Sequence, residues 1–201
     1  MKEVLLVLFC YLLGSIPFSY IFSRLLGGVD IRAKGTGNVG ATNVLRTLGV
    51  KIALASLMGD FLKGVLAAWL GLHFGGEILA ALCASMAVVG HCWPIFLGFK
   101  GGKGVATSAG LLLVLMPSVM LIIMLTFVTL IAVTRYVSLG SVCGAALLPL
   151  MLLFMHQPWS YIIMGFVLSG IVLFRHRENI QRLRKGTEKK INEKATVWEG
   201  K

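Results

Sequence analysis

A segment near the middle of the chain combines four glycines with two lysines. It reads Gly98-Phe99-Lys100-Gly101-Gly102-Lys103-Gly104. Glycine lets backbone N–H groups approach an anion closely, and a lysine adds a point charge beside them. The Walker A pattern is absent, because Leu97 stands at its first glycine and Gly104 at its serine or threonine. We predict that Lys100, Gly101, Gly102, Lys103 and Gly104 bind phosphate. Positive charge on a flexible turn is the alternative.

A second glycine-rich segment spans residues 35–43. Its small polar members include Thr36, Asn38 and Asn43. We expect Thr42 or Asn43 to cap the helix that follows. Arg46 would then lie in the first turn of that helix, where a cation opposes the helix dipole unless an anion is bound there. The segment therefore indicates a second anion-binding element, and an ordinary membrane-proximal loop with an orienting arginine is the alternative.

Three of the ionisable residues inside apolar runs are candidates for a specific role. His91 stands seven residues before Gly98 and is a candidate general base or hydrogen-bond donor to a ligand. A structural histidine at a proline-bent helix end is the alternative. Asp60 and Lys63 are three residues apart and share a helix face. We expect them to form an ion pair that orients the helix, and a catalytic base is the alternative role for Asp60.

Hydroxyl, amide and imidazole groups occupy two further segments. One carries Ser138 and Ser141, and the other carries His176 and Asn179, three apart on one helix face. Cations, amides and hydroxyls thus gather where carboxylates are scarce, a composition that suits a phosphorylated ligand. The sequence has no histidine–cysteine spacing typical of a metal site and no Gly-x-Ser-x-Gly elbow. Neither a metal nor a covalent nucleophile is therefore indicated.

The composition is that of a membrane protein. Of the 201 residues, 57% are hydrophobic and 13% are charged, and the net charge is +11. Soluble domains carry about 25% charged residues, so an ordinary soluble enzyme and a disordered chain are both excluded. The apolar runs are Val4–Leu26, Ile52–His73, Ile78–Leu97, Gly110–Thr134, Val142–Met155 and Tyr161–Phe174. They show no period-two alternation, so we expect an all-α integral membrane fold.

The basic residues predict the orientation of the chain. They gather in the segments 27–51 and 98–109 and in the tail after Arg175, whereas the turns 73–77 and 156–159 have no lysine or arginine. The positive-inside rule places the basic segments in the cytoplasm. The N-terminus is then outside and the C-terminus cytoplasmic.

Hydropathy leaves two counts of membrane crossings open. Seven crossings result if 110–134 is a hairpin broken near Pro117 and 142–174 crosses twice. Five result if each of these stretches crosses once. A 25-residue hairpin needs short pieces, whereas a single 33-residue crossing would contain two prolines.

Six groups of residues together resemble the bacterial acyl-phosphate:glycerol-3-phosphate acyltransferase family. They are Gly14–Phe18, Gly35–Asn43, Asp60–Gly64, Gly90–Pro94 with Phe99–Thr107, Arg135–Ser138 and Arg175–Asn179. The resemblance implies seven transmembrane helices, some short or broken, in a membrane acyltransferase domain of residues 1–188. Residues 189–201 would be a basic cytoplasmic tail. The protein would be a monomer in the bacterial cytoplasmic membrane, in contact with lipids, with its active site facing the cytoplasm.

The resemblance also implies the reaction. A fatty acyl group would move from acyl phosphate to the 1-hydroxyl of sn-glycerol 3-phosphate, giving 1-acylglycerol 3-phosphate and phosphate. This is the first step of phospholipid synthesis, and it needs no cofactor, coenzyme A or acyl carrier protein. The departing phosphate can take the hydroxyl proton itself, and His91 is the other candidate acceptor.

The resemblance assigns roles to the candidate residues. Glycerol phosphate would be bound by Lys103, Arg46, His176 and Asn179, near Thr36, Asn38 and Asn43. The glycine–lysine segment and Ser141 or Ser138 would hold the acyl phosphate head. The catalytic candidates are His91, Lys103, Arg46 and Asn43.

Two other classes of function remain as alternatives. A small-anion transporter or channel would also use a phosphate site, although the sequence has no visible internal repeat of the kind common in transporters. A membrane-anchored nucleic-acid binder would rest on the basic tail alone. We expect no nucleic-acid partner.

Overall fold

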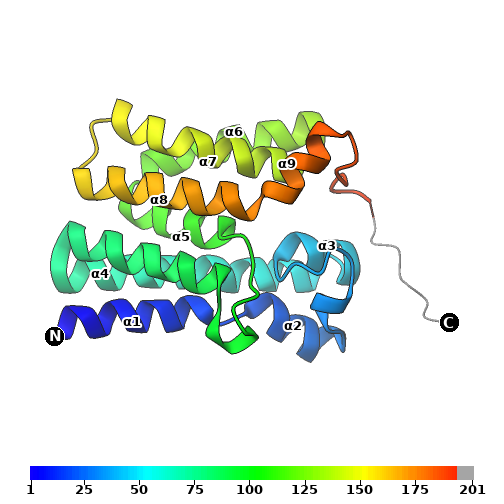
Figure 1. The fold of residues 1–201 in the computed structure, drawn as a ribbon, viewed down its shortest axis with the longest axis horizontal. Helices are drawn as coiled ribbons and strands as arrows, with labels where there is room; N and C mark the ends of the chain where they lie inside the picture. Colours follow the sequence, from blue (N-terminus) through cyan, green and yellow to red (C-terminus); the bar gives the residue numbers. More distant parts are fainter. Residues whose placement is uncertain (194–201) are drawn as a thin grey trace.

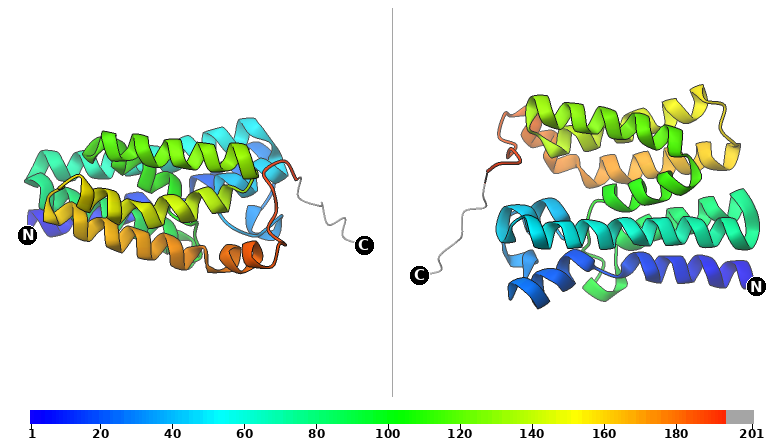
Figure 2. Two further views of the ribbon diagram at one scale, coloured as in Figure 1. Left: turned by 90° about the horizontal axis from the view of Figure 1, so that it is seen from above. Right: turned by 180° about the vertical axis from the view of Figure 1, so that it is seen from behind.

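The computed structural model describes residues 1–193, and every regular element in this range is helical. The elements are α1 (Lys2–Ser15), α2 (Phe18–Gly27), η1 (Ile31–Ala33), α3 (Ala41–Leu48), α4 (Val50–Cys92), η2 (Ile95–Leu97), α5 (Val105–Leu115), α6 (Pro117–Thr134), α7 (Val137–Phe154), α8 (Trp159–Arg175) and α9 (Arg177–Arg184). The long helices lie side by side in one bundle (Figure 1). The short helices α2, α3 and α9 lie at the end opposite the N-terminus (Figure 2).

Helix α4 is a hairpin of two arms. Its backbone leaves the helical region at Gly75 (φ −163°, ψ 17°) and Gly76 (φ 70°, ψ −158°). The positive φ of Gly76 lies in the region that glycine tolerates best. The arms then pack closely, because a Cβ added to Gly71 would meet the backbone of Ala80 at 2.5 Å. The turn predicted at 73–77 is therefore confirmed.

The first apolar run, Val4–Leu26, forms two helices rather than one. Helix α1 ends at Ser15 and α2 begins at Phe18. Pro17 has no N–H to continue the helix. At this break the carbonyl oxygen of Ile16 accepts hydrogen bonds from the Phe18 N–H at 3.2 Å and from the Lys63 Nζ at 3.0 Å. A partner from α4 thus stabilises the break.

A second break separates α5 from α6. Met116 is non-helical, and Pro117 is the first residue of α6, a position that proline favours. The break predicted near Pro117 is confirmed. Helix α5 has 11 residues, which corresponds to a length of about 16 Å. It is therefore about half as long as the hydrocarbon core is thick.

Several helices carry the length and hydropathy of membrane spans. Among the described residues these are Lys2–Gly27, Val50–Leu97, Pro117–Thr134 and Val137–Phe154; α8 and α9, bent by 59°, form a fifth if they are taken as one span. Only 11% of the residues of α6 are buried inside the protein. Such a continuous apolar surface is typical of a face in contact with lipid.

Glycines allow the inner helices to approach closely. A Cβ at Gly64 of α4 would collide with the carbonyl oxygen of Thr107, and one at Gly110 of α5 would collide with that of Phe61. Small residues commonly mediate helix packing in membranes. The Thr107 hydroxyl also donates to the Asp60 carbonyl oxygen at 2.9 Å. Helix α5 is therefore held against α4, with its first turn inside the bundle.

Candidate active site

One cavity of about 890 Å³ brings the candidate segments together. The candidate site residues that line it are Thr36, Asn38, Asn43, Arg46, His91, Lys100, Gly101, Lys103, Gly104, Ser138, Ser141, His176 and Asn179. Gly102 lines a small neighbouring cavity instead, together with Asp60, Lys63 and His91. Segments far apart in sequence thus meet in one place, as the sequence predicted.

Asn43 organises the glycine-rich segment 35–43. Its Oδ1 accepts from the Thr36 backbone N–H at 2.9 Å. Its Nδ2 donates to the carbonyl oxygens of Lys34 and Asn38, at 3.0 and 3.1 Å. The expected capping role of Thr42 or Asn43 is wrong, because α3 begins after Gly40 without a side-chain cap. Inside the loop the amide bonds both a backbone N–H donor and backbone carbonyl acceptors, which a helix cap would not allow it to do.

Arg46 lies in the last turn of α3, where we expected the first. A cation is favourable at that end of a helix, so the predicted conflict with the dipole does not arise. One terminal nitrogen of Arg46 donates to the carbonyl oxygens of Lys189 and Lys190, at 2.7 and 3.2 Å. Its buried Nε has no hydrogen-bond partner within residues 1–193. Arg46 therefore lines the cavity and has one N–H group without a partner among the described residues.

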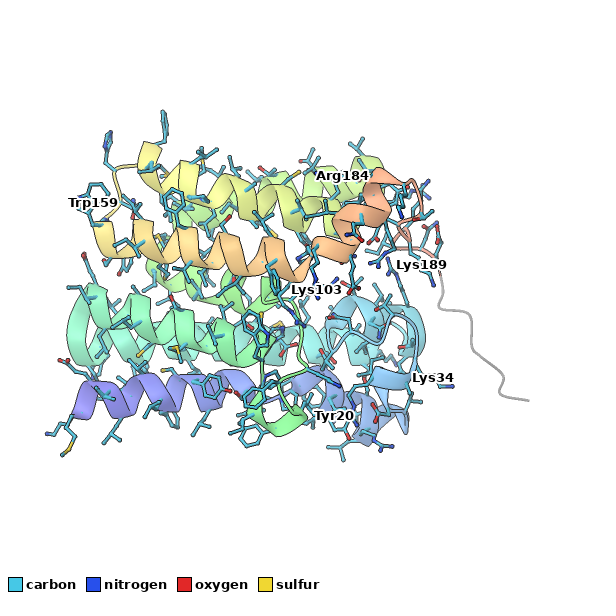
Figure 3. The ribbon with its side chains drawn as sticks, viewed as in Figure 1. Tyr20, Lys34, Lys103, Trp159, Arg184 and Lys189 are labelled. Carbon is cyan, nitrogen blue, oxygen red and sulfur yellow. The ribbon has the colours of Figure 1, made fainter. Side chains whose placement is uncertain are left out.

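Lys103 and Asn179 are directly bonded. The Lys103 ammonium donates to the Oδ1 of Asn179, and Lys103 lies within the bundle rather than at its tip (Figure 3). Burial lowers the pKa of Lys103 to about 8; Arg182 acts in the same direction, and Glu188 in the opposite one. An ammonium has three N–H donors, so two remain for a ligand.

The glycine–lysine loop is held from both sides of its backbone. Arg175 donates from Nε to the Gly102 carbonyl oxygen at 3.0 Å and from a terminal nitrogen to that of Gly101 at 2.7 Å. The two glycine N–H groups donate to the carbonyl oxygens of Cys92 and His91. These two N–H groups therefore already have partners within the protein, and phosphate binding by the glycine–lysine loop stays a prediction. The first turn of α5, beginning at Val105, lines the cavity and has N–H groups without helical partners.

His91 belongs to a buried polar cluster beneath this loop. The predicted ion pair is confirmed, with 2.9 Å between Lys63 Nζ and Asp60 Oδ1. The His91 Nδ1 lies 3.4 Å from the same oxygen, and the Ser19 hydroxyl donates to Asp60 Oδ2 at 3.1 Å. A Cβ at Gly102 would collide with His91 Nε2. The imidazole is thus packed between Asp60 and the loop.

The rest of the cavity is apolar. It extends between α5, α6, α7 and α8, where its lining includes Leu112, Met120, Ile123, Phe127, Leu148 and Leu168. Ser138 and Ser141 lie at the start of α7, close to the polar end. The cavity as a whole therefore suits a molecule with an anionic head and a hydrocarbon chain.

Known proteins share this sequence and fold. The family model described as glycerol-3-phosphate acyltransferase matches residues 4–186. The chain belongs to the glycerol-3-phosphate acyltransferase family. A curated glycerol-3-phosphate acyltransferase of Syntrophomonas wolfei is 56% identical over 97% of this chain and 100% of its own length. One of Moorella thermoacetica is 48% identical over 96% and 99%.

A solved structure of PlsY (YgiH), an integral membrane glycerol 3-phosphate acyltransferase, has the same fold. In its glycerol 3-phosphate form it superposes with a TM-score of 0.91 at 40% identity, covering 94% of this chain and 96% of the other. The lysophosphatidic acid form gives a TM-score of 0.89. The family and the all-helical integral membrane fold predicted from the sequence are therefore confirmed.

Three charged residues of this cavity were not among the predicted site residues. Arg175, Arg182 and Glu188 also line the cavity. All three belong to the basic stretch that begins at Arg175, for which charge alone predicts only the orientation of the chain. The Glu188 carboxylate accepts from the Ser138 hydroxyl at 2.7 Å and from the Asn179 Nδ2 at 2.6 Å. Burial alone would raise the pKa of Glu188, but hydrogen bonds from Asn179, Ser138 and Arg182 lower it below its usual value.

Proposed function

We propose that the protein transfers a fatty acyl group from an acyl phosphate to the 1-hydroxyl of sn-glycerol 3-phosphate. The observation that carries this proposal is the two-part cavity, whose cation-rich end continues into an apolar arm between helices. The hydroxyl oxygen attacks the acyl carbonyl carbon, and the bond from that carbon to the phosphate oxygen breaks. The products are 1-acylglycerol 3-phosphate and inorganic phosphate.

The polar end suits two phosphorylated substrates. Lys103, Arg46, His176 and Asn179 bind glycerol 3-phosphate, with Thr36, Asn38 and Asn43 beside it. Lys100, the first turn of α5, and Ser141 or Ser138 hold the acyl phosphate head, and the acyl chain lies in the apolar arm. The names of the relatives give the acceptor glycerol 3-phosphate. The acyl phosphate donor is implied by the resemblance of the sequence motifs to the acyl-phosphate-dependent family, and the two-part cavity suits it.

An acyl phosphate is already activated, so no enzyme nucleophile is needed. The proton of the attacking hydroxyl passes to the departing phosphate. The position of His91 supports this route, because its ring is packed against Asp60 and Gly102. His91 then acts as a support for the glycine–lysine loop, and its assignment as a proton acceptor is the less direct alternative.

We further propose seven membrane crossings. Counting the two arms of α4 separately, these are α1, both arms of α4, α5, α6, α7 and α8. The basic segments and the site then face the cytoplasm of a bacterial cell, and the N-terminus lies outside. Residues 1–188 form the catalytic domain of a monomer that works without a cofactor.

The test is phosphate release by purified protein in detergent. Palmitoyl phosphate should release phosphate rapidly only when glycerol 3-phosphate is present. Lys103→Ala should lower kcat/KM by about two to three orders of magnitude, which corresponds to a loss of several kcal/mol of transition-state stabilisation. Equal activity with palmitoyl-coenzyme A would refute the donor. Transport of unchanged glycerol 3-phosphate into liposomes, without acyl transfer, would instead support the transporter alternative.

A further inference from the structure

Glu188 is a buried carboxylate in the cation-rich end of the cavity. It is 7% exposed, whereas residues 184–187 and 189–190 are all exposed. Each of its oxygens has a hydrogen-bond donor: Ser138 and Asn179 donate to Oε1, and Arg182 Nε donates to Oε2 at 2.7 Å. A carboxylate held in this way by α7 and α9 has a defined position rather than the freedom of a tail residue.

The segment around Glu188 is also fixed through its backbone. We call residues 186–191 the C-terminal strap. Arg46 of α3 donates to its carbonyl oxygens at Lys189 and Lys190, and the Ile191 N–H donates to the Arg135 carbonyl oxygen at 2.8 Å. Lys189 lies at the polar end of the bundle, beside α9 (Figure 3). The strap thus connects α3, the start of α7 and α9 around the site.

The Glu188 carboxylate determines which way the Asn179 amide faces. An amide has a donor side and an acceptor side. Because Nδ2 donates to Glu188, Oδ1 faces Lys103 and accepts from its ammonium. The reverse orientation would place the amide donor against the ammonium and the amide oxygen against the carboxylate. Glu188 therefore acts on Lys103 through Asn179.

A carboxylate near a phosphate site can have a second role. It can be a stand-in for the phosphate, which occupies the phosphate position until the substrate displaces it. The bonding favours a permanent position. Displacement would break the three hydrogen bonds to the carboxylate, and moving the strap would also break the bonds from Arg46 and to Arg135. It would also leave the Asn179 amide free to rotate.

We propose that Glu188 is a positioning residue for acyl transfer, which fixes the Asn179 amide so that it holds Lys103 toward the phosphate of glycerol 3-phosphate. This inference deepens the proposed function and rests on it. The strap is accordingly part of the site, although the family model ends at residue 186.

The experiment compares Glu188→Gln and Glu188→Asp with Glu193→Gln. The control removes the same charge five residues further on, at an exposed position. Glutamine has one acceptor oxygen, so it cannot satisfy the donors on both sides of the original carboxylate. We expect Glu188→Gln to raise the KM and the calorimetric Kd for glycerol 3-phosphate about ten- to hundredfold, as expected for buried donors left unpaired.

The separate kinetic constants distinguish positioning from a merely structural effect. The KM for palmitoyl phosphate should change less than about threefold, within the range of one weak contact. Glu188→Asp should recover part of the loss, and the control should resemble the unsubstituted protein. A lower KM for glycerol 3-phosphate in Glu188→Gln would identify a displaced stand-in and overturn the proposal. A fall in kcat alone, with KM and Kd unchanged, would overturn it too.

Combined substitutions test the route through Asn179. In an Asn179→Ala background, Glu188→Gln should have a much smaller effect on glycerol 3-phosphate binding than it has alone. Additive effects would overturn the route. Binding does not require the acyl donor, so a protein that fails to use palmitoyl phosphate but still shows this coupling would refute the proposed donor and leave the positioning role standing.

Discussion

The affinity for glycerol 3-phosphate should fall as the pH rises through 8, because Lys103 then loses its charge. Burial lowers the pKa of this ammonium to about 8. Below pH 8 the ammonium is charged and attracts the phosphate, and above pH 8 the neutral amine does not. Arg175 and Arg182 oppose the charge, and Glu178 and Glu188 favour it.

The size of the effect follows from the titration. With a pKa of about 8, the charged fraction of Lys103 falls from about 0.9 at pH 7 to about 0.1 at pH 9. A bound phosphate dianion raises the pKa of Lys103 in the complex, so binding selects the charged form. The Kd should therefore rise about tenfold between pH 7 and pH 9, which is about 1.4 kcal/mol. Neither guanidinium groups nor the phosphate dianion titrates across this range.

Isothermal titration calorimetry in detergent at constant ionic strength measures this change. Lys103→Gln should bind more weakly at pH 7 and show a nearly flat dependence on pH. The matched control is Lys51→Gln, which removes an exposed lysine at the start of α4 and should retain the tenfold change. A flat profile in the unsubstituted protein, or the same slope in Lys103→Gln, would refute the reasoning.

Three further substitutions test the supports of the site. Arg175→Lys should lower kcat/KM in the phosphate-release assay about ten- to hundredfold, because lysine cannot hold both glycine carbonyls of the loop in the same planar fork; unchanged activity would contradict that role. Gly110→Ala should destabilise the protein by about 1–3 kcal/mol in thermal unfolding, since the new Cβ meets the α4 backbone. Gly170→Ala, which meets no atom within 4 Å, is its control. Asp60→Asn should lower the free energy of unfolding by about 3–5 kcal/mol, because Lys63 is left charged and buried without its partner. A melting temperature equal to that of the unsubstituted protein would show that this ion pair does not stabilise the fold.

The general fold could be predicted because hydropathy and helix breakers both act locally. Glycine at 75 and 76 and proline at 117 mark turns by their own backbone preferences. The break at Pro17 was missed because apolar residues continue on both sides of it. It depends on Lys63, which is distant in sequence and donates to the Ile16 carbonyl oxygen. Contacts of this kind are outside what local patterns can predict.

The membership of the site followed from residue type, whereas the partners of each residue did not. An asparagine side chain can cap a helix or hydrogen-bond the backbone of a loop. Asn43 does the second, since its amide bonds backbone groups of Thr36 and Lys34. Glu188 looked like one acid in a basic tail, since its burial is visible only once α7 and α9 meet around it. The proposed tail of residues 189–201 also begins with contacts to Arg46 and Arg135, and residues 194–201 lie outside the described range.

The cations at this membrane face have two different tasks. Lys63 and Arg175 satisfy carbonyl oxygens that helix breaks and loops leave unpaired inside the bundle, where such groups are costly. Lys103 and Arg46 also contact the protein, but both line the cavity and each has N–H groups without a partner among the described residues. An anion that reaches both would satisfy those donors together. For this reason the proposed phosphate of glycerol 3-phosphate lies between α3 and the start of α5, rather than within the glycine–lysine loop alone.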